Sequence, residues 1–120
     1  KPSDIGAVIV CTVSSDYFSP STACLIQGRL GLPNDIIAFD LSAGCSGFIF
    51  GLETMRGVLM SRGCKAGLLI GAEVLSKKMD MTDRSTCVLF GDGAAAAVFV
   101  PTDGLYSSVS GVDGDEEMSV

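Results

Sequence analysis

The sequence predicts an α/β fold in which helices pack on a mixed, mostly parallel β-sheet. Apolar runs of strand length occur at residues 5–13, 36–39 and 66–74. They alternate with two segments, residues 22–30 and 47–62, that have the composition and boundaries of helices. The first and third runs are apolar on both faces, as strands in the middle of a layered sheet are. Strands that alternate with helices favour a layered architecture with parallel strands.

The length and composition limit the classes of protein that fit. The 120 residues suffice for one modest domain or a piece of a larger one, and the 48% that are hydrophobic can form a sizeable core. No run of about 18 apolar residues is present, so we expect no membrane span, and the start of the chain lacks the pattern of a signal peptide. The net charge of −6 indicates no nucleic-acid partner.

The five cysteines are too widely spaced to form a metal or disulfide motif. Neither a C-x-x-C pair nor a histidine occurs, which argues against a zinc site and a disulfide framework and favours a reducing cytosol. We therefore predict a cytoplasmic protein without a bound metal. Four cysteines lie in or beside apolar runs and are expected to be ordinary packing residues: Cys11, Cys24, Cys64 and Cys87.

The first helix is predicted from its boundary residues. A loop at residues 14–20 follows the first strand, and Ser21 or Thr22 is a suitable N-cap. Gly31 has the conformational freedom needed at the C′ position, so the helix is expected to end just before it. A turn at residues 33–35 (PND) then leads into the second strand.

A candidate nucleophile lies where the second strand leads into the second helix. The strand ends at Asp40, and a turn of small residues carries Cys45 to a helix expected to begin near Gly47. At a helix start, unpaired N–H groups and the positive end of the dipole favour thiolate over thiol and lower the pKa of a cysteine. The small residues around Cys45 follow the steric logic of a nucleophile elbow and leave room for a ligand. The alternative is a small buried thiol in a well-packed turn.

The second helix changes character along its length. Residues 48–50 (FIF) direct apolar side chains to all sides, whereas the later turns divide into a polar face and an apolar face. At 3.6 residues per turn, this pattern describes a helix that starts inside the protein, emerges toward solvent and ends before Gly63. A buried helix start that carries Cys45 is unusual unless the site is used, which strengthens the assignment of Cys45 as a nucleophile.

The remainder of the chain is expected to form a long loop and further strands. After the third strand, residues 75–85 are polar and are predicted to be an exposed loop, while residues 86–90 fit either a strand or a helical turn. Residues 91–93 (GDG) lack the other residues of a phosphate-binding loop, so we expect a tight turn in which the Asp92 carboxylate binds nearby backbone. Residues 94–100 form a strand of small residues that another layer must approach closely, and residues 105–112 fit a last strand.

Three motifs follow one another in a specific order and spacing: residues 40–48 (DLSAGCSGF), Asp83-Arg84 followed by Thr86, and residues 90–94 (FGDGA). Together they resemble the β-ketoacyl-acyl-carrier-protein synthase III family of condensing enzymes, and the resemblance covers essentially the whole chain. It implies a thiolase-like layered fold with a buried central helix that starts near Cys45. It also implies that residues 1–120 are part of the N-terminal half of such an enzyme, with the C-terminal half outside this sequence.

The resemblance implies roles for four residues. In this family a cysteine takes the acyl group from acyl-CoA, and malonyl on acyl carrier protein then loses carbon dioxide and attacks the acyl-enzyme. Cys45 corresponds to that nucleophile, and its backbone N–H to one donor for the oxyanion. Arg84 corresponds to a contact with the CoA nucleotide, and Leu75 and Phe90 to residues that line the acyl pocket. Acyl-CoA is a substrate, and no separate cofactor or metal is implied.

Without the resemblance, the residues at three of these positions have ordinary explanations. The guanidinium of Arg84 is equipped to stack on a base and pair with phosphate, but it also fits a solvated loop charge paired with Asp83. Leu75 and Phe90 would simply be core residues.

The resemblance also implies a cytoplasmic homodimer that starts fatty acid synthesis, with acyl-CoA and acyl carrier protein as partners. This sequence departs from the family in several respects: it lacks the family's first strands, the tryptophan and arginine that help hold CoA, and the groups for decarboxylation. The family uses a histidine and an asparagine from its second half for decarboxylation, and this chain contains no histidine. A thiolate can be acylated without a neighbouring base, because cysteine is intrinsically nucleophilic. We therefore expect acylation of this chain at most, and no condensation.

Three other classes of protein are alternatives to this assignment. A non-catalytic structural or dimerisation module with the thiolase fold would associate through exposed apolar surface and would not react with acyl-CoA at Cys45. A cysteine hydrolase would need a histidine after the nucleophile, and none is present. A cysteine phosphatase would need an arginine at the position of Gly51.

Overall fold

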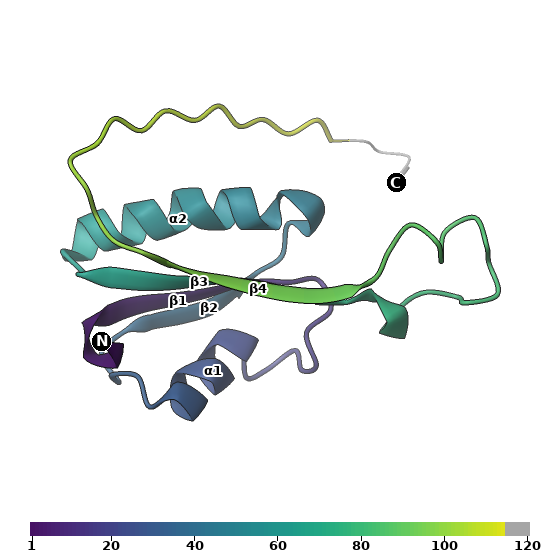
Figure 1. Cartoon of the computed structure of the whole chain (residues 1–120), viewed down its shortest axis with the longest axis horizontal. Coiled ribbons are helices and arrows are strands. Elements are labelled where there is room, and N and C mark those ends of the chain that lie inside the picture. Colours follow the sequence, from purple (N-terminus) through teal and green to yellow (C-terminus); the bar gives the residue numbers. More distant parts are fainter. Residues whose placement is uncertain (115–120) are drawn as a thin grey trace.

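The computed structural model describes residues 1–114, which form a four-stranded sheet with one helix on each face (Figure 1). The elements in chain order are β1 (Ile5–Cys11), α1 (Thr22–Leu30), β2 (Ile37–Leu41), α2 (Gly47–Arg62), β3 (Ala66–Val74) and β4 (Asp92–Phe99). Short 3₁₀ turns occupy Pro2–Asp4 (η1), Gly44–Ser46 (η2) and Leu75–Lys77 (η3). The strand order is β2-β1-β3-β4; β1 is parallel to β2 and β3, and β4 is antiparallel to β3. This arrangement confirms the predicted α/β class and its mostly parallel sheet.

The core consists of two clusters, one on each face of the sheet. Successive side chains of a strand point to opposite faces, so β1, which lies between β2 and β3, contributes to both clusters. The cluster on the α1 side contains Ile5, Val8, Val10, Ala23, Leu32 and Ala66. The cluster on the α2 side contains Ala7, Ile9, Cys11, Met55, Leu59 and Leu69.

Both helices begin and end where the sequence predicts. The Ser21 Oγ accepts a hydrogen bond from the Cys24 N–H at 3.3 Å, so Ser21 is the N-cap of α1. Gly31 and Gly63 end the two helices in the left-handed conformation, with φ of 60° and 62°. Glycine adopts this conformation without the strain that a Cβ would cause.

Strand boundaries differ from the prediction at three places. β1 ends at Cys11, because the next residues turn toward the end of β3. Asp40 lies inside β2, opposite Val10, rather than at its end. The predicted tight turn at residues 91–93 is wrong: Asp92 is extended and pairs with Val74 in the β3–β4 ladder. Its carboxylate does accept a backbone hydrogen bond, as predicted, from Ser76.

The strand predicted at residues 105–112 is not present. This segment is irregular and runs along the outer side of α2 (Figure 1). The hydroxyl of Tyr106 donates to Glu53 Oε1 at 2.8 Å, and the Tyr106 ring centroid lies 4.7 Å from the Arg56 Cζ. Side-chain contacts with a helix therefore replace the backbone pairing that a strand would need.

Several apolar groups predicted to be buried are exposed in this chain. The start of α2 is not surrounded: Ile49 is 57% exposed, because only one face of the helix packs on the sheet. The small residues of β4 are also mostly exposed, with no second layer over them in residues 1–114. Among the cysteines predicted to pack, Cys11 is buried, but Cys24 is exposed.

One close approach in the core can be tested with two glycines of α2. A Cβ at Gly51 would lie 2.5 Å from the Cys11 Sγ and 2.8 Å from the Leu69 Cδ1, whereas a Cβ at Gly57 would meet nothing within 4 Å. We expect Gly51→Ala to lose about 1–3 kcal/mol through overpacking, against a gain of up to about 1 kcal/mol in helix propensity. Gly57→Ala should gain about 0.5–1 kcal/mol. Urea unfolding of both variants measures the difference, and equal stabilities would contradict this packing.

Candidate active site

Cys45 lies in a tight turn between β2 and α2. The turn begins after Leu41 and contains η2, in which Gly44 has a φ of 51° and its carbonyl accepts a hydrogen bond from the Gly47 N–H. Helix α2 then begins at Gly47, as predicted. Cys45 therefore lies next to the first turn of α2, whose N–H groups lack intrahelical partners. The prediction that Cys45 lies at a buried helix end is wrong for this chain, since the residue is exposed.

The start of α2 is pressed against the sheet, which fixes the turn that carries Cys45. A Cβ at Gly47 would lie 3.4 Å from the Cys11 Cβ, and a Cβ at Gly71 would lie 3.4 Å from a ring carbon of Phe48. Cys11 itself belongs to the core, and burial raises the pKa of its thiol. Cys45, outside the core, is the cysteine that a substrate can reach at this helix start.

Asp40 connects the strand before Cys45 to the other helix. Its Oδ2 accepts the Thr22 N–H at 2.7 Å and its Oδ1 accepts the Ala23 N–H at 2.8 Å. These are the first two residues of α1, whose N–H groups would otherwise be unsatisfied. A carboxylate is also favoured at the positive end of a helix dipole. Sequence reasoning missed this role, because the partners lie 18 and 17 residues away.

The carboxyl ends of the parallel strands meet at one edge of the sheet. Cys45 follows β2 and Leu75 follows β3, while antiparallel β4 begins at the same edge, two residues after Phe90. The Thr12 N–H donates to the Leu41 carbonyl at 3.1 Å and extends the contact between β1 and β2 past the end of β1. Three of the four predicted site residues are thus placed near one edge.

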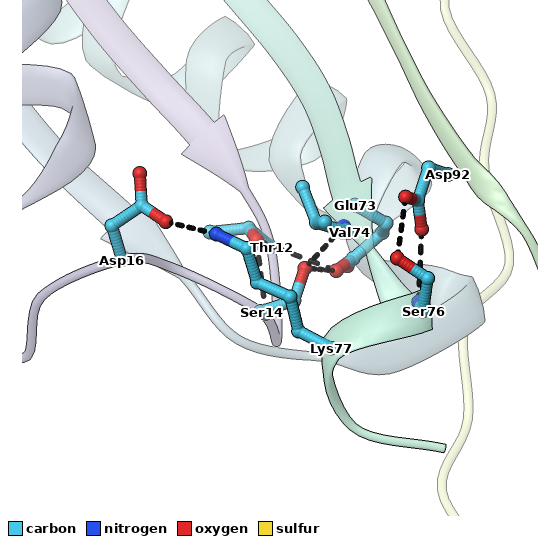
Figure 2. Close-up of polar contacts among 8 residues, drawn as sticks. All are labelled: Thr12, Ser14, Asp16, Glu73, Val74, Ser76, Lys77 and Asp92. Atoms are coloured by element: carbon cyan, nitrogen blue, oxygen red, sulfur yellow. Dashed lines mark hydrogen bonds and ion pairs between the residues drawn. The ribbon is translucent and has the colours of Figure 1, made fainter. Parts of the chain in front are cut away.

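A partly buried polar network joins the residues after β1 to the end of β3 at this edge (Figure 2). Glu73 Oε1 accepts the Val13 N–H at 2.9 Å, and Oε2 accepts the hydroxyls of Ser14 and, at 3.4 Å, Thr12. The Ser14 Oγ in turn accepts the Val74 N–H at 2.7 Å. Thr12 and Ser14 are buried, so these bonds satisfy groups that water cannot reach. A single acidic residue within the apolar run at residues 66–74 was the available sequence signal for Glu73.

Arg84 is exposed on the long loop between β3 and β4. The Asp83 carboxylate accepts bonds from the Ser85 hydroxyl at 2.6 Å, the Ser85 N–H at 2.9 Å and the Thr86 hydroxyl at 2.9 Å. These bonds lower the pKa of Asp83. The alternative in which Asp83 pairs with Arg84 is therefore wrong for this chain, where the guanidinium is in solvent.

The residues around Arg84 form turns rather than a strand. The Leu89 N–H donates to the Thr86 carbonyl at 3.0 Å, and the Cys87 N–H donates to the Asp83 carbonyl at 3.0 Å. Phe90 is 46% exposed and is not a core residue in this chain. Leu75, at the start of the loop, is half-buried.

Two cavities lie away from the sheet edge that carries Cys45. One, of about 410 Å³, lies between α2 and the segment after β4, and its lining includes Leu52, Met55, Leu59, Phe99 and Tyr106. The other, of about 290 Å³, has a more polar lining that includes Asp4, Asp35, Arg62, Cys64 and Lys65. Neither is lined by Cys45, Leu75, Arg84 or Phe90.

Two further findings concern residues 1–114. They contain no cluster of three or more histidine, cysteine or acidic side chains placed to hold a metal ion. No helix in this part of the chain has the length and apolar character needed to cross a membrane.

The mixed sheet and the cysteine before its long helix define a thiolase-like α/β protein. The model of the 3-oxoacyl-[acyl-carrier-protein] synthase III family matches residues 39–114, and the chain belongs to this family. This confirms the family indicated by the three sequence motifs.

Individual relatives support the same family. The chain is 50% identical over 113 residues to a β-ketoacyl-[acyl-carrier-protein] synthase III of Clostridium beijerinckii, which covers 92% of this chain and 35% of that protein. It is 57% identical over 99 residues to the synthase III of Campylobacter jejuni subsp. doylei, a match that covers 82% of this chain and 30% of that protein. The crystal structure of 3-oxoacyl-[acyl-carrier-protein] synthase III from Aquifex aeolicus VF5 has a TM-score of 0.78 and 44% identity, covering 86% of this chain and 33% of that one. The chain thus spans about a third of the length of these relatives.

The anchoring role of Asp40 can be measured directly. Asp40→Ala leaves the first N–H groups of α1 without their acceptor, and loss of such a cap costs about 1 kcal/mol. We expect a lower midpoint in urea unfolding and faster hydrogen exchange at the amides of Thr22 and Ala23. Asp35→Ala removes the same charge from an exposed turn and serves as the control. Unchanged exchange at both amides in Asp40→Ala would contradict the assigned role.

Proposed function

We propose that this chain is the nucleophile-bearing part of a β-ketoacyl-acyl-carrier-protein synthase III. The observation that carries the proposal is the exposed Cys45 in the turn at the start of α2, in a chain of this family. An exposed thiol in the turn that leads into a helix N-terminus suits nucleophilic attack on a thioester. The overall reaction transfers an acyl group from acyl-CoA and condenses it with malonyl-acyl-carrier-protein to start fatty acid synthesis.

In the first proposed step, the Cys45 thiolate attacks the carbonyl carbon of acyl-CoA. A carbon–sulfur bond to Cys45 forms, and the carbonyl oxygen becomes an oxyanion to which the Cys45 backbone N–H donates. The oxyanion collapses, the bond to the CoA sulfur breaks, and CoA leaves as a thiolate. In the second step, malonyl-acyl-carrier-protein loses carbon dioxide, and the resulting carbanion attacks the acyl-Cys45 carbonyl and releases the Cys45 thiolate. The family resemblance assigns decarboxylation to a histidine and an asparagine, and this sequence has no histidine.

Three other residues receive roles in the proposed acylation. We assign Arg84 to the CoA nucleotide, since an exposed guanidinium can pair with phosphate and stack on a base. We assign Leu75 and Phe90 to the acyl pocket, and their positions at the sheet edge of Cys45 support this. Acyl-CoA is the substrate in this scheme, and no additional cofactor takes part.

The family also suggests a cellular setting for the chain. We propose that residues 1–120 are part of the N-terminal thiolase-like domain of an enzyme that works in the cytoplasm. Its partners in the proposed reaction are acyl-CoA and acyl carrier protein. Membership of the synthase III family supports each of these proposals.

We further propose that the protein is a homodimer. β4 is an outermost strand of the sheet, and among residues 1–114 its outer side has no partner strand. After Asp92, the strand has no charged residue, and Val98 is 61% exposed. Proteins commonly protect free edges with charges, so an uncharged apolar edge favours association with another strand.

Intact-mass measurement after incubation with acetyl-CoA tests the proposed nucleophile. We expect the wild-type chain to gain one acetyl group and Cys45→Ser to gain none, because the serine hydroxyl is a far weaker nucleophile than a thiolate. Cys24→Ser is the control, since Cys24 is also exposed but lies in the first turn of α1, where Asp40 and Ser21 already accept the N–H groups. An unmodified wild-type chain would instead favour the non-catalytic module.

Light scattering tests the proposed dimer. We expect the mass of two chains for the wild type and of one chain for Val98→Lys, because a lysine on the edge strand opposes pairing. Val109→Lys introduces the same charge at an exposed site outside the sheet and should stay dimeric. A monomeric wild-type chain at working concentration would count against the dimer.

A further inference from the structure

The loop between β3 and β4, residues 75–91, is here called the arm. It starts with η3 and projects beyond the end of the sheet (Figure 1). It carries Leu75, Arg84 and Phe90, the residues that the proposed function assigns to acyl-CoA. How this substrate is held therefore depends on how the arm is fixed to the sheet.

The base of the arm is closed by Asp92, the first residue of β4 (Figure 2). Its Oδ1 accepts the Ser76 N–H at 2.9 Å, and its Oδ2 accepts the Ser76 hydroxyl at 2.6 Å. Asp92 also pairs with Val74, so one residue holds the first residues of the arm against the end of β3. Hydrogen bonds to a charged acceptor are roughly twice as strong as bonds between neutral groups.

Inside the arm, the hydrogen bonds are local. Asp80 binds Thr82, and Asp83 binds Ser85 and Thr86, within three residues in each case. Such bonds shape turns but do not fix the arm relative to the sheet. Exposed apolar side chains, those of Met81, Val88 and Leu89, likewise provide no packing against the core.

A second charged contact of the arm within residues 1–114 is weak by comparison. Lys77 Nζ lies 2.7 Å from Asp16 Oδ1, and both side chains are largely exposed. Exposed ion pairs usually contribute little to stability, because solvent screens them and two long side chains must be ordered. The bidentate contact between Asp92 and Ser76 is therefore the main polar restraint on the base of the arm.

We propose that Asp92 is a positioning residue for acyl-CoA, because it fixes the base of the arm and so holds Leu75, Arg84 and Phe90 in one arrangement. This inference rests on the proposed function. Asp92 does not touch the reacting atoms in this scheme. An arm that is already ordered does not lose conformational freedom when substrate binds, so its ordering favours affinity. Loss of the contact should therefore weaken acyl-CoA binding and leave the reactivity of bound thioester unchanged.

The thiols of the chain report on the order of the arm without any substrate. Cys87 is a half-buried arm residue, and Cys11 is buried in the core. We expect iodoacetamide to label Cys87 about fivefold faster in Asp92→Ala than in the wild type, with Cys11 still protected, because the arm opens locally. Asp92→Asn, which keeps one acceptor and the side-chain shape, should restore most of the protection. Asp103→Ala, with the same charge change on an exposed turn, is the control.

If Cys11 also becomes reactive in Asp92→Ala, the chain has unfolded, and Ser76→Ala then decides. This variant removes one of the two bonds and keeps the carboxylate, so Cys87 should be labelled about twofold faster than in the wild type. Where Asp92→Ala stays folded, adding Ser76→Ala to it should label Cys87 no faster than Asp92→Ala alone. Unchanged Cys87 labelling in whichever variant remains folded would overturn the proposal.

The dependence of Cys45 acylation on acetyl-CoA concentration tests the role in binding. We expect Asp92→Ala to raise the half-saturating concentration about fivefold and to keep the limiting rate within about twofold. A lower limiting rate at unchanged half-saturation would overturn a positioning role in binding. If the wild-type chain is not acylated, the proposed function fails and acyl-CoA is no longer the ligand for which the arm is positioned. The Cys87 rates then still decide whether Asp92 fixes the arm.

Discussion

The structure depends on the burial of β1 from both faces. Ala7, Val8, Ile9 and Val10 are fully buried, and alternate side chains face α1 and α2. Among residues 1–114, none of the other strands has four such residues in succession. Because apolar burial is the main favourable term in folding, the element that is buried twice determines where both helices lie. The parallel neighbours of β1 then end at one edge of the sheet, where Cys45 is placed.

At that edge, three carboxylates fix neighbouring segments through hydrogen bonds. Asp40 binds the start of α1, Glu73 binds the residues after β1, and Asp92 binds the start of the arm. Each carboxylate accepts hydrogen bonds with both of its oxygens. An ionised carboxylate can therefore bind two donors at the same time. Loops after parallel strands leave N–H groups unpaired, so an acidic side chain nearby both satisfies them and fixes the loop. The three carboxylates explain how an edge with little apolar packing keeps a defined shape.

The sequence predicts those features whose causes lie close together in the chain. The ends of both helices follow from Ser21, Gly31 and Gly63, and the start of α2 beside Cys45 follows from the small residues around it. The partners of Asp40 and Asp92 lie 16 to 18 residues away, so no local pattern shows them. The exposed start of α2 escaped prediction for another reason. An apolar side chain such as Ile49 favours burial. It is buried only where another part of the protein packs against it, and residues 1–114 provide no such surface for Ile49.

The two steps of the proposed reaction, acylation of Cys45 and condensation with the malonyl group, need different groups on the protein. The proposed acyl transfer needs a reactive thiol, an oxyanion donor and a bound thioester, which we assign to the turn before α2 and to the arm. Carbon–carbon bond formation also needs groups that stabilise a carbanion after decarboxylation, and the proposed mechanism assigns them to a histidine that this sequence lacks. A thiolate is a good nucleophile without a base, so the first step does not depend on the second. The proposal therefore places the chemistry of this chain, taken alone, at Cys45.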